Sequence, residues 1–301
     1  MKYAVIDLGT NTFHLLIIDS SSKSLSNEIY RERIFVKLAE NGIRTIGKNA
    51  YQRGLQALKH FHKIILEHQV EKVKAFGTAA LRTASNGKDF VQEVQSKIGL
   101  TIQLIPGSEE ARLIHQGVIQ AVELGDEKGL IMDIGGGSVE FIIADKNQVF
   151  WAESFPIGVA VIHNTFHKKE PIHPVEIEMI HAHFEEMLQP LFDVLKKYKT
   201  PCLVGASGTF DVLENLLPLT QKTELSVSID VRSFFPLYHK IIKMNMEERR
   251  AKESIPLSRA DMIVVALVLI EFIIKKAEIE KLMVSAYAMK EGILWEMTRN
   301  E

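Results

Sequence analysis

The chain has 301 residues, 46% of them hydrophobic and 25% charged, which is typical of a globular protein of two domains. Its formal net charge of −2 argues against general nucleic-acid binding, because no excess of Lys and Arg exists to neutralise many phosphates. The single cysteine, Cys202, permits no internal disulfide, and residues 262–274, the most apolar stretch, are too few for a membrane span, so we expect a cytoplasmic protein without membrane association.

Apolar periodicity predicts an α/β protein in two halves of similar architecture. The first half is expected to contain a hairpin at 3–18, a strand at 25–38, a helix at 50–67, a strand at 73–76, a helix at 88–98 and a strand at 101–105. A helix capped by Ser108 then runs from about 106 to 123 and joins the halves. The second half is expected to contain three strands within 128–155, helices at 159–166 and 174–198, a strand at 202–204, a buried helix at 261–276, a strand at 281–285 and a helix at 289–298.

The turn between two of these strands has an unusual composition. An apolar run ends at Asp133, three glycines (Gly135, Gly136 and Gly137) and Ser138 follow, and the next apolar run contains Glu140. Consecutive glycines let the backbone approach a ligand closely and direct successive N–H groups at a phosphate. The two carboxylates are suitable ligands for a hard divalent cation.

The first hairpin repeats this arrangement. Asp7 corresponds to Asp133 and Gly9 to Gly135, and Thr10 and Asn11 follow in the turn. A single Asp-x-Gly turn is weak evidence, since both residues are common in turns. Two matching turns that open two matching halves predict instead a ligand site in the cleft between the domains.

Two further regions contain candidate chemical groups. Helical spacing places Glu110 on the apolar face of the predicted 106–123 helix and Glu109 on its solvated face. Glu110 could therefore activate a water molecule, although acidic residues in a first helical turn also stabilise the helix dipole. Arg82 follows a strand among small residues, from which its guanidinium could bind a phosphate. His163 and His167 have zinc-like spacing but no evident third ligand, so we expect ordinary histidines there.

These stretches resemble the exopolyphosphatase / guanosine pentaphosphate phosphatase family, which belongs to the acetate-kinase, sugar-kinase, Hsp70 and actin superfamily. The likeness covers essentially the whole chain, and its motifs occur in the family's order. The matching motifs are Asp7-Leu-Gly-Thr-Asn-Thr-Phe-His14, Gly77-Thr-Ala-Ala-Leu-Arg82, Gly107-Ser-Glu-Glu-Ala-Arg-Leu-Ile114, Asp133-Ile-Gly-Gly-Gly-Ser-Val-Glu140, Phe155-Pro-Ile-Gly158, Gly205-Ala-Ser-Gly-Thr209, Arg259-Ala-Asp261 and Met289-Lys-Glu-Gly-Ile-Leu294.

The resemblance implies two ribonuclease H-like domains of the actin-like ATPase type, with mixed sheets flanked by helices and the active site between them. Residues 1–113, joined by the final helix at about 286–301, would form the first domain, and residues 114–285 the second. The implied activity is hydrolysis of the terminal phosphate of polyphosphate or guanosine pentaphosphate, the latter a stringent-response nucleotide, with Mg²⁺ or another divalent cation.

The resemblance also implies a role for each matching residue. Glu110 would be the catalytic base rather than Glu109. Asp133 and Glu140 would hold the metal, with Asp7 as a further candidate. Phosphate would be bound by Gly9, Thr10, Asn11, Arg82, Gly135, Gly136, Gly137 and Ser138.

Three departures from the family pattern bear on the substrate. Residues 159–162 lack an arginine that the family usually has, and Lys290 replaces a commoner arginine, which loses the guanidinium fork. The chain also resembles the short two-domain form, so short polyphosphates and guanosine pentaphosphate are both plausible substrates. The alternatives are a small-molecule kinase of the same superfamily and a non-catalytic alarmone sensor. A homodimer is compatible with the sequence.

Overall fold

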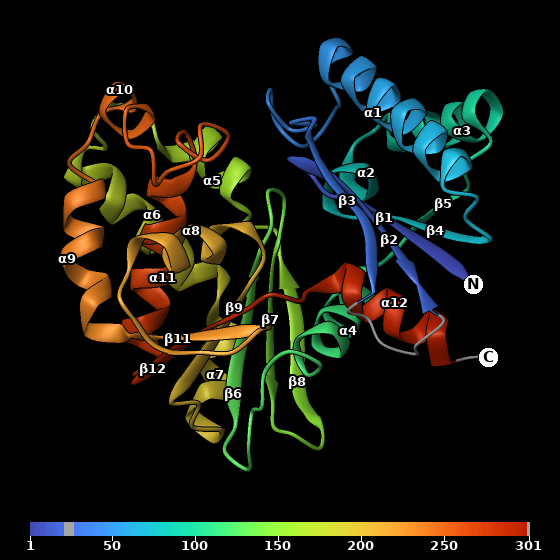
Figure 1. Ribbon diagram of the computed structural model, residues 1–301. Coiled ribbons are helices and arrows are strands. Elements are labelled where there is room, and N and C mark those ends of the chain that lie inside the picture. The colour runs from blue at the N-terminus through green and yellow to red at the C-terminus, as the bar shows by residue number, and fades with distance from the viewer. Residues whose placement is uncertain (21–26, 300–301) are drawn as a thin grey trace.

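Two mixed β-sheets, each covered by helices on its outer face, lie on either side of a central pair of helices (Figure 1). The computed structural model describes residues 1–20 and 27–299. The predicted fold class, two α/β domains with mixed sheets flanked by helices, is confirmed. Among the described residues, no helix combines the length and the apolar character needed to cross a bilayer.

The N-terminal sheet has five strands in the order β3-β2-β1-β4-β5. The first hairpin and β3 are antiparallel, whereas β1, β4 and β5 run parallel. Buried residues of this sheet pack against α1 and α3 on its outer face. The elements are β1 (Lys2–Leu8), β2 (Thr12–Asp19), β3 (Glu28–Phe35), α1 (Lys48–Glu67), β4 (Lys72–Gly77), α2 (Ala79–Thr83), α3 (Gly87–Ile98) and β5 (Ile102–Leu104).

The C-terminal sheet has seven strands in the order β10-β11-β12-β9-β6-β7-β8. Its helices lie to the left of the sheet in Figure 1, with the apolar helix α11 at the centre of their core. The elements are β6 (Gly129–Ile134), β7 (Val139–Ala144), β8 (Val149–Phe155), α5 (Val159–Phe166), α6 (Pro174–Met187), α7 (Gln189–Lys197), β9 (Cys202–Ala206), α8 (Gly208–Leu216), β10 (Leu219–Lys222), β11 (Ser226–Asp230), α9 (Val231–Ile241), α10 (Met246–Arg250), α11 (Ile263–Lys276) and β12 (Lys281–Ser285).

The internal repeat is a repeat of topology. The order β8-β7-β6-β9-β12 reproduces the order β3-β2-β1-β4-β5, with the same pattern of antiparallel and parallel pairs. Strands β10 and β11 extend only the second sheet. The two glycine turns, which connect β1 to β2 and β6 to β7, are therefore equivalent positions of the two domains.

Helices α4 (Gly107–Val118) and α12 (Met289–Arg299) form the layer between the sheets. They cross closely because glycines lie at the contact: a Cβ on Gly117 would lie 1.9 Å from the carbonyl oxygen of Ala288, and one on Gly292 2.0 Å from that of Leu113. The predicted domain boundary at 113/114 falls within α4, and that division of the chain remains a prediction.

Several predicted elements are corrected. Pro106, rather than Ser108, is the N-cap of α4, with no side-chain cap hydrogen bond, and α4 ends at Val118 instead of 123. The predicted helix at 174–198 is two helices that meet at Leu188. Arg82 lies in the short helix α2 instead of a loop. The strand predicted at 25–38 is described as β3, and positions 25 and 26 lie outside the described residues.

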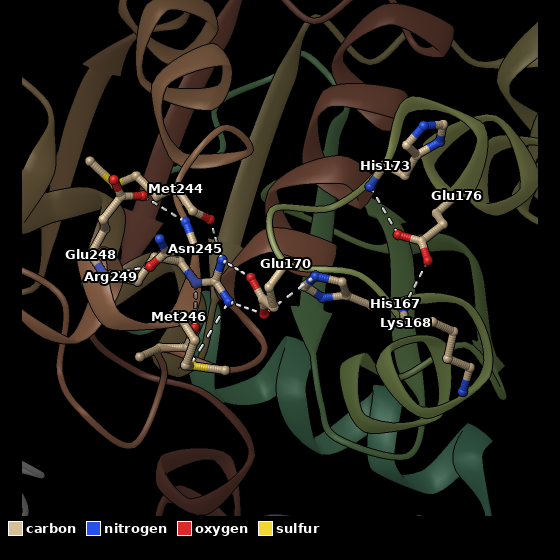
Figure 2. Close-up of polar contacts among 11 residues, drawn as sticks. His167, Lys168, Glu170, His173, Glu176, Met244, Asn245, Met246, Glu248 and Arg249 are labelled. Atoms are coloured by element: carbon tan, nitrogen blue, oxygen red, sulfur yellow. Dashed lines mark hydrogen bonds and ion pairs between the residues drawn. The ribbon is translucent and has the colours of Figure 1, made fainter.

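A buried arginine organises the loops beside α11. Arg249 is fully buried and makes a two-point contact with the Glu170 carboxylate, at 2.8 and 2.5 Å (Figure 2). It also donates to the carbonyl oxygens of Met244 and Ala260. The buried charge is thus paired and hydrogen-bonded, and the Arg249 guanidinium connects the segments that contain Glu170, Met244 and Ala260. His167 lies on the other side of Glu170, 3.5 Å away.

Candidate active site

Two glycine turns of the same geometry face one cavity. In the first turn, the N–H of Gly9 donates to the carbonyl of Thr12 at 3.1 Å; in the second, the N–H of Gly135 donates to that of Ser138 at 3.0 Å. A Cβ atom added to Gly136 would lie 2.7 Å from the Asn11 side chain and would clash with it. The turns are therefore in contact with each other, and glycine is required for this approach.

The carbonyl groups of both turns are occupied on the side away from the cavity. Residues 36–38 donate to Asn11 and Thr10, and residues 158–160 at the start of α5 donate to all three glycines of the second turn. Because the C=O and N–H groups of a trans peptide point in opposite directions, this pattern directs the N–H groups of the turns toward the cavity. Among the described residues, the N–H groups of Gly136 and Gly137 donate to no backbone carbonyl. They remain available to an anion.

The cavity has a volume of about 120 Å³ and is lined by both domains. Its wall contains every predicted site residue except Arg82. The predicted residues that line it are Asp7, Gly9, Thr10, Asn11, Glu110, Asp133, Gly135, Gly136, Gly137, Ser138 and Glu140.

Strand register pairs two of the three carboxylates that line the cavity, and the third, Asp7, comes from the other sheet. Asp133 and Glu140 are directly paired across β6 and β7, so their side chains lie on one face of the sheet. Burial raises the pKa of Asp133, and it raises the pKa of Glu140 to about 7, with the Asp133 charge as a further cause. Asp7 on β1 is half-buried. The loss of hydration that comes with burial raises the pKa of its carboxyl group to about 7.

Glu110 lies near the start of α4, on the inward face that its helical position predicts. It is 8% exposed, and its Oε2 accepts a hydrogen bond from Nη1 of Arg82 at 3.2 Å. Burial, and then the neighbouring Glu140 charge, raise the pKa of Glu110 well above its ordinary value, whereas Arg82 lowers it. Glu109 points away from the cavity and forms an ion pair with Arg112 at 2.8 Å.

Residues 17–301 match the model of the Ppx/GppA phosphatase family. This chain belongs to that family. Its structure also superimposes on an exopolyphosphatase from Cytophaga hutchinsonii with a TM-score of 0.93 and 36% identity, covering 100% of this chain and 98% of that chain. A Ppx/GppA family member from Aquifex aeolicus gives a TM-score of 0.79 at 24% identity, covering 100% and 98% of the two chains, and shows the shared fold.

The family and the exopolyphosphatase similarity identify the chain as a phosphoanhydride hydrolase. The carboxylates that line the cavity of this Ppx/GppA phosphatase are oxygen ligands, the type that a divalent metal ion binds. The described residues contain no group of three or more His, Cys, Asp or Glu side chains arranged to hold a metal. Mg²⁺ is commonly bound by one or two carboxylates together with substrate phosphates. The buried pair Asp133 and Glu140, whose mutual repulsion a cation would relieve, fits that requirement.

Three basic residues of this Ppx/GppA site were not assigned a role from the residues alone. Lys290 is 8% exposed at the start of α12, lines the cavity and lies 3.0 Å from Glu291. Arg33 on β3 and Arg259 before α11 line the cavity as well. Among the described residues, no hydrogen bond or ion pair engages the Arg259 guanidinium, which packs over Gly208. The alternation of β3 could have indicated that Arg33 faces the same side as Asp7.

The predicted role of Arg82 as a phosphate ligand remains a prediction, because Arg82 does not line the cavity and instead contacts Glu110. The loop after β9, a weak candidate in the sequence, contributes Ser207 and Gly208 to the wall. His163 and His167 pack ring against ring, 5.0 Å between centroids, and belong to no metal group among the described residues.

Proposed function

We propose that the chain hydrolyses the terminal phosphate of inorganic polyphosphate, of guanosine pentaphosphate or of both, with Glu110 activating the attacking water. One observation carries the proposal: a buried glutamate with a raised pKa borders a cavity that is lined by two glycine turns and a carboxylate pair. A carboxylate with a raised pKa, when ionised, accepts a proton from water more readily than an ordinary carboxylate does.

In this mechanism the terminal phosphate lies between the two turns. The N–H groups of Gly136 and Gly137 compensate negative charge on its oxygens as the transition state forms. Glu110 orients a water molecule and accepts its proton while the water oxygen bonds to phosphorus. The bridging P–O bond breaks, and its electron pair leaves with the shortened chain.

Asp133 and Glu140 would hold a divalent cation, Mg²⁺ by preference, with Asp7 as a further ligand. When bound, the cation neutralises charge on the phosphoryl oxygens. Lys290 supplies positive charge from the protein itself. Its charge acts on both Asp7 and Asp133 and lowers the pKa of each.

Phosphate release from tripolyphosphate, long-chain polyphosphate, guanosine pentaphosphate and nucleoside triphosphates, measured side by side with Mg²⁺, tests this function. We expect release from at least one of the first three substrates. Transfer of phosphate from ATP to a small acceptor would instead indicate the kinase, and tight binding of guanosine pentaphosphate without turnover would indicate the sensor. Action on guanosine pentaphosphate would link the chain to the stringent response. A cytoplasmic location is a separate part of the proposal.

A further inference from the structure

The order of the strands in both sheets places Glu110 toward one end of the cavity and Arg33 toward the other. In the N-terminal sheet, Arg33, His14 and Asp7 are paired in one row across β3, β2 and β1. Arg82 and the start of α4 follow β4 and β5, on the other side of Asp7. Glu110 therefore lies at one end of the cavity and Arg33 at the opposite end.

The strands of the C-terminal sheet order its site residues in the same sense. Ser154 of β8 hydrogen-bonds Glu140 of β7 at 2.6 Å and also contacts Gly107 at the start of α4, so this side lies beside Glu110. Asp211 lies in α8, which follows β9 on the other side of β6. The Nη1 atom of Arg33 lies 3.1 Å from Oδ2 of Asp211, so an ion pair connects the two domains at the end far from Glu110.

This ion pair separates the catalytic cavity from a second one. Arg33 and Asp211 line both, together with Ser285 and Ala286. The second cavity has a volume of about 480 Å³, and carboxylates outnumber cations in its wall. Its charged residues are Glu28, Asp211, Glu214, Glu224, Glu291, Arg31 and Arg33.

We propose that Arg33 binds the substrate chain on the leaving side of the reaction, and that Asp211 and the carboxylates beyond it restrict the site to short phosphate chains. The inference rests on the proposed function, because in-line attack by water at Glu110 places the leaving oxygen on the opposite side of the phosphorus. The rest of the chain must then extend toward Arg33. A guanidinium can bind a phosphate through two parallel hydrogen bonds.

The resting contact is suited to exchange. The side chains of Arg33 and Asp211 are 41% and 38% exposed, and a pair this exposed adds little stability. A phosphate can therefore replace Asp211 as the partner of Arg33. A longer chain would next meet the carboxylates of the second cavity, whose repulsion opposes further phosphates. Asp211 thus acts as a specificity-determining residue, and Arg33 as a binding residue.

The test compares Arg33→Gln, Asp211→Asn and the wild type on tripolyphosphate and long-chain polyphosphate, with KM and kcat measured separately. Arg33→Gln should raise KM for both substrates about 10-fold with little change in kcat. Asp211→Asn should raise kcat/KM for the long chain relative to tripolyphosphate by about 3-fold or more, because a repulsive charge is removed. Unchanged KM in Arg33→Gln, or an unchanged ratio in Asp211→Asn, would overturn the proposal.

Lys37→Gln is the matched control. Lys37 forms another ion pair between the domains, 2.6 Å from Asp261, but neither residue lines either cavity. The same rise in KM in this variant would assign the effect to weakened domain contacts and overturn the proposal. Calorimetric binding of tripolyphosphate separates the two hypotheses: binding that requires Arg33 without any phosphate release supports the role of Arg33 in binding the phosphate chain but refutes the proposed function and, with it, the assignment of a leaving side. Phosphate release that does not depend on Arg33 would support the proposed function and refute this inference.

Discussion

The Nη1 atom of Arg82 lies 3.2 Å from Oε2 of Glu110 and 2.7 Å from the carbonyl oxygen of Ile105. Arg82 is thereby held between the end of β5 and the proposed base. The contact favours the ionised form of a carboxylate whose pKa is raised by burial. It also fixes the orientation of Glu110 toward the cavity.

Replacement of Glu110 by Gln should lower kcat about 100-fold or more, because the amide cannot accept a proton from water. The side-chain volume is unchanged, so the thermal unfolding temperature should stay close to that of the wild type. Glu109→Gln, one position earlier on the exposed side of α4, is the control and should keep near-normal turnover. Near-normal phosphate release by Glu110→Gln would refute the assignment of the base.

Replacement of Arg82 by Met should move the acidic limb of the kcat/KM profile to higher pH. The Arg82 charge lowers the pKa of Glu110, so its removal raises that pKa further and more of the base is protonated near neutrality. The measurement is a pH–rate profile with saturating Mg²⁺. A limb that stays in place while activity falls would show that Arg82 acts on the substrate rather than on Glu110.

Without a metal, the protein should become less stable as the pH rises from about 4 to about 7. Folding raises the pKa of Asp7 from 3.8, and that of Glu140 from 4.5, to about 7. Below the unfolded values these groups cost no stability. Between the unfolded and the folded values the unfolded state has released its protons while the folded state still holds them, so stability falls with rising pH, and the loss is complete above the folded values. The unfolding temperature with a chelator should therefore be lower by several degrees at about pH 8 than at about pH 5.5.

Added Mg²⁺ should reverse this loss at the higher pH, since a cation stabilises the ionised carboxylates. Asp133→Asn should abolish most of the Mg²⁺ effect on the unfolding temperature and raise the Mg²⁺ concentration needed for activity. Asp145→Asn offers a control, because Asp145 is a turn carboxylate outside the cavity. An equal response to Mg²⁺ in the wild type and Asp133→Asn would exclude Asp133 as a metal ligand.

Gly117→Ala should destabilise the protein by about 2 kcal/mol or more, because the new Cβ would clash with the carbonyl of Ala288 and force α4 away from α12. The free energy of unfolding can be measured with urea. Ser108→Ala, in the same helix but exposed and without a capping role, should change it by less than about 0.5 kcal/mol. A tolerated Gly117→Ala would show that the helix contact can relax.

Much of the site could be predicted because its groups are close in sequence or repeated. Asp133 and Glu140 flank one turn, and a hairpin brings such residues together by local pairing alone. The matching turn at Asp7 indicated two equivalent halves. The inward face of Glu110 followed from helical spacing within one element. These features require no knowledge of how the domains are placed.

The partners of these residues were decided only by the tertiary structure. Arg82 contacts Glu110, and Arg33 contacts Asp211, across separations that no periodicity relates. Similarly, Lys290 reaches the cavity because Gly117 and Gly292 let α12 pack closely against α4 between the sheets. Local patterns determine which face of a strand or helix is apolar and which turn is built from glycines. Contacts between distant charges depend instead on domain packing, which is a property of the whole chain.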